Sequence, residues 1–169
     1  MRLALVPLLA ALSACATSVA LAQTPAASAS SAPQASNAVQ ILSTSRLAAL
    51  ADSLPPGAST SHQITSWDGL SNMISRRDTS GIHERHEGFT DIFVVQRGHA
   101  RLRYGGTAEG ERSSSPGEWR GGTIRNGTEA EINAGDIVVI PAGIPHQLLL
   151  PPGESFYYFV FKVAKHPAR

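Results

Sequence analysis

The sequence contains almost no cysteine: Cys15, near the N-terminus, is the only one. The rest of the chain therefore has no disulfide, no thiol chemistry and no paired-cysteine zinc site. An excess of charge is also missing, since 14 basic and 13 acidic residues nearly cancel. A chain balanced in this way gives no indication of nucleic acid or of an anionic surface as its partner.

Common catalytic signatures are missing as well. There is no Gly-rich phosphate loop that leads into a helix, and no Gly-x-Ser-x-Gly elbow. A long apolar stretch occurs at the N-terminus, where MRLALVPLLAALSACATSVALAQ has one positive residue, an apolar region and small residues before a polar chain. Residues 1–22 are interpreted as a signal peptide that ends at Ala22, which predicts a periplasmic or secreted protein. The alternative is a lipobox ending at Cys15, which would give a lipoprotein anchored to a membrane.

The next segment has low complexity. Residues 23–37 are rich in alanine, serine and proline, so they cannot bury enough apolar surface to fold. We interpret them as a disordered linker that leads into one domain, residues 38–169. This domain opens with a helical pattern over 43–54, which Pro55 and Pro56 end.

Beyond the helix the hydrophobic period changes to two, and clusters of Gly, Pro, Ser and Asp separate short apolar runs. Many short strands of this kind predict an all-β sandwich or barrel. Two of the runs, 136–141 and 155–163, are apolar on both faces, so something must cover the second face. The 43–54 helix and the partner of a possible homodimer are candidates, unless both strands simply lie inside a sandwich. The predicted strands lie near 61–67, 72–77, 91–97, 99–104, 122–125, 128–132, 136–141, 145–150 and 155–163.

Residues 135–146, GDIVVIPAGIPH, carry the sharpest pattern: Gly, five residues, Pro, one residue, Gly, two residues and His146. This resembles the second motif of the cupin family. Upstream, GIHERHEGFTDIFVVQRG (81–98) is similar to the first cupin motif when it is counted back from Gly98. The resemblance covers about residues 61–163 and implies a cupin jelly-roll β-barrel, here preceded by the short helix.

The resemblance also implies a single divalent metal ion inside the barrel. It places Glu84 at the first histidine position of the first motif, His86 at the second and Asp91 at the glutamate position, with His146 from the second motif. Alternation along a strand puts Glu84 and His86 on one face and His83 on the other, so His83 is expected at the surface or rim. Two imidazoles and two carboxylates suit iron, manganese or zinc.

The chain departs from the cupin pattern in ways that leave its particular activity open. Glu84 and Asp91 replace the usual histidine and glutamate, and residues 105–127 are expected to form a long inserted loop. A pocket without metal is the competing interpretation, in which the two carboxylates pair with Arg85, Arg101 or Arg103. The first hypothesis for function is a metal-dependent enzyme of the dioxygenase, isomerase or lyase type that acts on a small organic molecule. The alternative is a non-catalytic cupin that binds or senses a small molecule, with or without metal.

Overall fold

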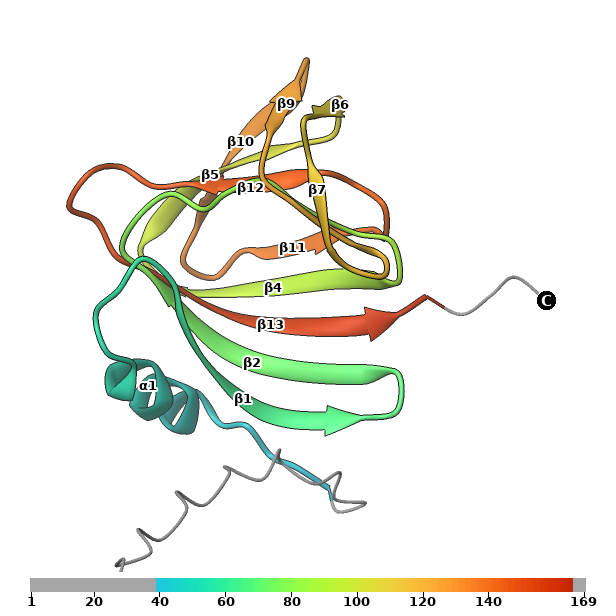
Figure 1. Cartoon of the computed structure of the whole chain (residues 1–169). Helices are drawn as coiled ribbons and strands as arrows, with labels where there is room; N and C mark the ends of the chain where they lie inside the picture. Colours follow the sequence, from blue (N-terminus) through green and yellow to red (C-terminus); the bar gives the residue numbers. More distant parts are fainter. Residues whose placement is uncertain (1–38, 166–169) are drawn as a thin grey trace, which may run out of the picture. The chain divides into compact units, whose positions relative to one another are not determined.

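The computed structural model describes residues 39–165, in two main sheets and one helix (Figure 1). The predicted signal peptide, linker and Cys15 lie outside the described residues. One sheet runs in the order β1 (Thr60–Trp67), β2 (Leu70–Arg77), β13 (Phe156–Ala164), β4 (Phe89–Arg97) and β11 (Ile137–Ile140). The other runs in the order β10 (Thr128–Asn133), β5 (His99–Tyr104), β12 (His146–Leu149), β3 (Glu84–His86), β8 (Glu118–Arg120) and β7 (Arg112–Ser115). A third, two-stranded sheet pairs β6 (Thr107–Glu109) with β9 (Thr123–Arg125).

The main core lies between the two large sheets, because each contributes every second residue of its strands to one cluster. Along β4, Phe93 and Val95 are buried as the alternation predicts, and Asp91 continues the same row. The all-β jelly-roll prediction is thereby confirmed, and the predicted strands lie within a few residues of the observed ones. The buried cluster consists of Phe93, Val95, Ala100, Leu102, Ile132, Ile140, Leu148, Phe156, Tyr158 and Val160.

A single helix, α1 (Thr44–Ser53), covers the outer face of the first sheet beside β2 (Figure 1). Ser43 caps it by accepting a hydrogen bond from the backbone N–H of Arg46 at 3.2 Å. Ala51 and Leu54 pack there with outward-facing residues of β2 and β13. The prediction that the 43–54 helix covers one doubly apolar strand is therefore confirmed for β13. Within residues 39–165, no helix has the length and hydrophobicity needed to cross a membrane.

The other doubly apolar strand, β11, is an edge strand with an open outer face. Ile137 and Val139 are 68% and 58% exposed. The inner face of β11 packs against the core through Val138 and Ile140. Coverage of Ile137 and Val139 by the partner of a homodimer stays a prediction.

The prediction of an inserted loop over 105–127 is wrong. This segment forms β6 to β9, and β8 joins the second large sheet by pairing with β3. Strand β9 lies where a strand was predicted, near 122–125. Strands β6, β7 and β8 are short and have no buried residue, so they lack the apolar alternation by which strands are predicted. Hydrogen bonds to neighbouring strands form these elements, and such long-range pairing is not visible in the local sequence.

Gly98 turns the chain sharply between β4 and β5. Its φ is +82°, and a Cβ there would lie 2.3 Å from the carbonyl oxygen of Ser155. Only glycine fits this conformation and this close approach. The glycine that anchors the first motif thus fixes the return of the chain from β4, which carries Asp91.

Candidate metal centre and adjoining cavity

The four side chains proposed from the sequence as metal ligands lie together between the two sheets. Glu84 and His86 are on β3, Asp91 is on β4, and His146 begins β12 directly opposite Glu84. One ligand atom from each of Glu84, His86 and His146 lies within 4.8 Å of the other two. Oδ2 of Asp91 lies 3.4 Å from Nε2 of His86 and 4.0 Å from Nε2 of His146. The fold therefore gathers the whole proposed set, and metal binding by it stays a proposal.

Hydrogen bonds orient both imidazole rings. Nδ1 of His86 lies 2.6 Å from a carboxylate oxygen of Glu118, and Nδ1 of His146 lies 3.0 Å from the carbonyl oxygen of Ile144. Because both partners are acceptors, each Nδ1 donates its hydrogen, and in a neutral ring the lone pair is on Nε2. Nε2 is the nitrogen that lies within 4.0 Å of Asp91 in both rings. This is the orientation in which metal-binding histidines are held.

Glu84 is kept ionised by its neighbours. Burial works against its charge, but His86 and the guanidinium groups of Arg120 and Arg77 outweigh that penalty. They hold the pKa of Glu84 well below its usual range. Arg120 Nη1 lies 2.8 Å from Oε2, and Arg77 Nη2 donates to Oε1 at 3.3 Å. Glu84 can therefore offer a carboxylate, although both of its oxygens already have partners.

The two histidines differ in how easily they take up a proton. Burial and the charge of Lys162 lower the pKa of His86, whereas neighbouring carboxylates, Glu84 and Asp91 among them, raise it. The effect of the carboxylates is the larger, so the pKa of His86 lies above its ordinary value. Burial dominates at His146 and lowers its pKa. His146 is therefore the ring that is more readily neutral, while at His86 a metal ion would compete with a proton.

Lys162, a cation that the sequence analysis missed, lies inside this group. Its Nζ lies 2.9 and 3.0 Å from the two carboxylate oxygens of Asp91 and 3.1 Å from Nε2 of His86. Residues 155–163 were interpreted as an apolar strand, and Lys162, the one charged residue among them, was not considered as part of the site. Alternation could have found it, because Tyr158, Val160 and Lys162 share one face and the first two belong to the core.

The segment that was expected to be a loop supplies two further residues of the site. Glu118 and Arg120 are on β8, where pairing with β3 places them opposite His86 and Glu84 respectively. No signal in the sequence indicated these partners, because they lie more than thirty residues from β3. Arg85 on β3 pairs with Trp119 on β8, and its guanidinium lies 4.9 Å from the centre of the indole ring. This cation–π contact stabilises the pairing of β8 with β3 on the outer side.

The alternative in which Glu84 and Asp91 pair with Arg85, Arg101 or Arg103 is wrong. Arg85 pairs with Glu111 and Glu87, while Arg101 and Arg103 pair with Glu129. Alternation explains the difference: Arg85 follows Glu84 on β3 and points to the opposite face. On β5, Arg101 and Arg103 alternate with buried Ala100 and Leu102, so they face away from the core. These three arginines therefore do not contact Glu84 or Asp91, which pair with Arg77, Arg120 and Lys162.

His83 points away from the proposed ligands as expected, but its predicted position at the surface or rim is wrong. Its side chain is buried, and Nδ1 donates a hydrogen bond to the carbonyl oxygen of Gly121 at 2.7 Å. Nε2 lies 3.7 Å from a carboxylate oxygen of Glu111. The strands formed by residues 107–125 cover this face of β3, which the expectation of an open loop did not provide.

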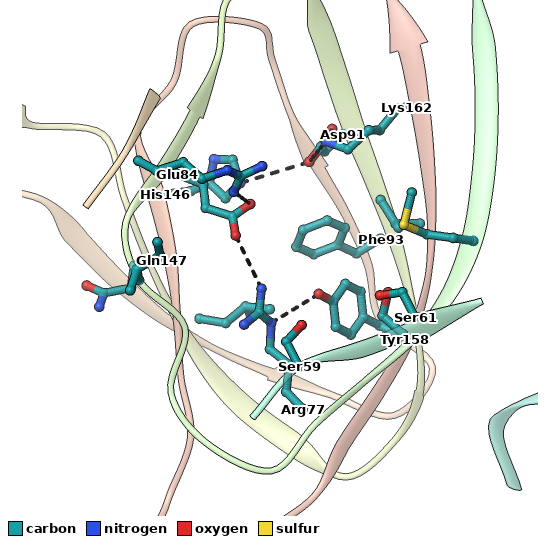
Figure 2. Close-up of a pocket in the computed structure, with 16 residues that line it drawn as sticks. Ser59, Ser61, Arg77, Glu84, Asp91, Phe93, His146, Gln147, Tyr158 and Lys162 are labelled. Atoms are coloured by element: carbon teal, nitrogen blue, oxygen red, sulfur yellow. Dashed lines mark hydrogen bonds and ion pairs between the residues drawn. The ribbon is translucent and has the colours of Figure 1, made fainter. Parts of the chain in front are cut away.

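A cavity of about 250 Å³ adjoins the proposed ligands (Figure 2). Its wall includes Glu84, Asp91 and His146. Three cationic side chains, Arg77, Arg120 and Lys162, line it together with groups that can form hydrogen bonds, namely Ser59, Ser61, Ser75, Gln147 and Tyr158. Its apolar lining is Met73, Ile82, Phe93, Leu148 and Val160. This lining suits a small organic molecule with at least one negatively charged group.

The donor set fits a divalent metal ion. Glu84 offers a carboxylate oxygen, and His86 and His146 offer imidazole nitrogens that their Nδ1 hydrogen bonds keep in the required tautomer. Mixed nitrogen and oxygen donors suit iron, manganese and zinc. Three protein donors would leave coordination positions for water or a substrate oxygen. The arrangement can therefore support Lewis-acid chemistry at the wall of the cavity.

No protein-family model matches the chain, and no curated protein matches it at a significant level. Solved structures do resemble it. The Cnp3 cupin domain of Schizosaccharomyces pombe has a TM-score of 0.51 and 6% identity over 68% of this chain and 66% of that chain. The plu4264 protein of Photorhabdus luminescens has a TM-score of 0.47 and 16% identity over 68% of this chain and 82% of that chain. A cupin 2 conserved barrel domain protein of Rhodopseudomonas palustris has a TM-score of 0.45 and 17% identity over 65% and 63% of the two chains.

At these identities the resemblance concerns the fold alone. The likeness to the Cnp3 cupin domain extends over 68% of this chain. The described part of this chain has the cupin fold.

Proposed function

We propose that the protein binds one divalent metal ion through Glu84, His86 and His146 and acts as a metal-dependent enzyme on a small organic anion. The observation that carries this proposal is the convergence of two oriented imidazoles and one carboxylate at the wall of a cavity. Asp91 is the fourth candidate ligand, because its Oδ2 lies within 4.0 Å of Nε2 in both rings.

The organic ligand is proposed from the charges that line the cavity. Two carboxylates and three cationic side chains line it, so a bound divalent ion would make the cavity strongly positive. A guanidinium has five N–H donors, more than the bonds of Arg77 to Glu84 and Tyr158 require. Arg77 is therefore the residue proposed to orient a carboxylate or another oxyanion beside the metal ion.

A bound divalent ion would act as a Lewis acid that polarises a coordinated oxygen of the substrate. The protein side chains would supply orientation and hydrogen bonds. Tyr158 is buried, burial raises the pKa of its hydroxyl, and Arg77 donates to its oxygen at 3.2 Å. Tyr158 therefore stays protonated and can donate a hydrogen bond into the cavity.

The metal content of the full chain, purified without a tag that binds metals, tests the first part of the proposal. We expect about one iron, manganese or zinc ion per chain, lost in His86→Ala and His146→Ala. His62→Ala is the matched control, because His62 is exposed on β1 and should not affect metal content. Metal that persists in both site variants, or a folded protein that takes up no metal after reloading, would overturn the assignment.

Turnover tests the second part. The metal-loaded protein is incubated with small hydroxy acids, keto acids and sugar acids, and each mixture is followed for product and for oxygen uptake. Product formation that requires both metal and Arg77 supports an enzyme. Saturable binding of an acid without conversion would instead support the non-catalytic binding protein, the alternative that the sequence also allows.

A further inference from the structure

The Lys162 ammonium lies beside the proposed metal site. Its Nζ contacts two of the four candidate ligands, lying 3.1 Å from Nε2 of His86 and 2.9 and 3.0 Å from the oxygens of Asp91 (Figure 2 shows the contact with Asp91). Asp91 and His86 are 3% and 2% exposed, so this contact is buried. The Lys162 ammonium thus has the carboxylate and imidazole partners that a bound metal cation would have.

The contact with His86 excludes a metal ion at the same atom. Nδ1 of His86 carries the hydrogen that is donated to Glu118. The neutral ring therefore has one lone pair, on Nε2, and Lys162 donates into it. A metal ion would need that lone pair at about 2.0–2.2 Å, so the Lys162 hydrogen bond and a metal–His86 bond cannot exist together.

The contact with Asp91 adds electrostatic competition. Lys162 donates to both carboxylate oxygens, so it neutralises the charge that would otherwise help to attract a divalent ion. If the Lys162 ammonium stayed in place, it would also repel the metal ion, because the two positive charges would be close together in a buried site where water screens them poorly. The Lys162 side chain is 23% exposed, whereas that of Asp91 is 4% exposed. Lys162 is thus the partner that can move toward solvent.

We propose that Lys162 is a built-in competitor for the cation position, so that a divalent metal ion binds only when the Lys162 ammonium withdraws from His86 and Asp91. The inference rests on the proposed metal site and identifies the residue that sets its affinity. Its consequence is a site with two exclusive states: one closed by Lys162, and one with metal bound and Lys162 displaced.

Metal affinity in Lys162→Met tests the competition. Methionine keeps the length and apolar stem of lysine but removes the charge and the donor. We expect zinc to bind at least about tenfold more tightly than to the wild type in a chelator competition, because no ammonium then has to be displaced from His86 and Asp91 before the ion binds. Lys165→Met is the control, since Lys165 is the only other lysine of the chain and is exposed. Lys162→Gln replaces the methionine variant if that variant fails to fold.

Two outcomes separate the possible failures. Equal zinc affinity in the wild type and Lys162→Met would overturn the competition by Lys162 and leave the metal site intact. An absence of zinc binding in both proteins would overturn the metal site and the competition together. Tighter binding in Lys162→Met alone supports both.

Chemical labelling of the wild type provides a second readout that needs no substitution. Each lysine is acetylated by a limiting reagent with and without zinc, and the two sites are quantified by mass spectrometry. We expect zinc to accelerate the acetylation of Lys162 severalfold and to leave Lys165 unchanged, because only Lys162 is released to solvent. Unchanged labelling of Lys162 at saturating zinc would overturn the displacement.

Discussion

Replacement of Glu118 tests how the inserted strand β8 supports the proposed metal centre. Glu118 accepts the Nδ1 hydrogen of His86 at 2.6 Å, a short, charge-assisted hydrogen bond that fixes both the tautomer and the ring orientation. Glu118→Ala removes the acceptor, and Glu118→Gln keeps an acceptor but removes its charge. In both variants the four candidate ligands remain.

The size of the effect follows from that hydrogen bond. A hydrogen bond to a charged group contributes about 1.5–3 kcal/mol net, and loss of such a partner weakens metal binding by roughly 10–100-fold. We expect the loss of metal affinity to lie near the upper end of this range for Glu118→Ala and near the lower end for Glu118→Gln. Zinc affinity measured by chelator competition gives the value, and Glu129→Gln is the control because Glu129 pairs with Arg101 and Arg103 outside the site.

The loss of affinity should also depend on pH. Glu118 is one of the groups that raise the pKa of His86, so its removal lowers that pKa and weakens the competition from protons. The loss of affinity should therefore be larger at pH 8 than at pH 6, because a fall in pH adds more competition from protons at His86 in the wild type than in the variant. Equal affinities for the wild type and a folded Glu118→Ala at pH 8 would refute this role of β8.

Two further predictions concern stability. Phe156 is fully buried between the sheets, so Phe156→Ala should lower the free energy of unfolding by about 3–5 kcal/mol, whereas Ile137→Ala, at a position 68% exposed, should change it by less than about 1 kcal/mol in urea denaturation. Equal losses would contradict the placement of the core. Asp78 accepts hydrogen bonds from Arg76, Ser155 and a backbone N–H, which lower its pKa to about 2. Its contribution is therefore present above the unfolded-state pKa of about 3.9 and is lost as the pH falls toward 2, so the stability advantage of the wild type over Asp78→Asn should shrink between pH 5 and pH 3. An advantage that stays constant over this range would exclude the proposed linkage.

The sequence was sufficient to predict that the four candidate ligands lie together, because they lie in short motifs. His146 follows a turn that is marked by Pro and Gly, and Glu84, His86 and Asp91 lie within eight residues of one another. Their relative directions follow from alternation along a strand, which needs only local sequence. The helix was predictable for the same reason, because its cap at Ser43 and the prolines after Leu54 directly adjoin it in the chain.

The pairing of β3 with β8 could not be predicted from the sequence. Glu118 and Arg120 reach the site through a register between β3 and β8 that is set by hydrogen bonds across 32 positions or more. Strands β7 and β8 of the insert carry few apolar residues, so no periodic pattern marked them. Burial of His83 depends on the same strands, and it could not be predicted while that segment was taken for a loop.

The charges of the site explain why these long-range residues matter as much as the motif. The motif supplies two carboxylates, but the fold has already paired Glu84 with Arg77 and Arg120, and Asp91 with Lys162. A divalent ion entering the site would therefore replace contacts between protein charges instead of satisfying unpaired negative charge. Metal affinity should then be governed by how readily those cations yield, and Lys162, which shares ligand atoms with the ion, is the one whose removal should change affinity most.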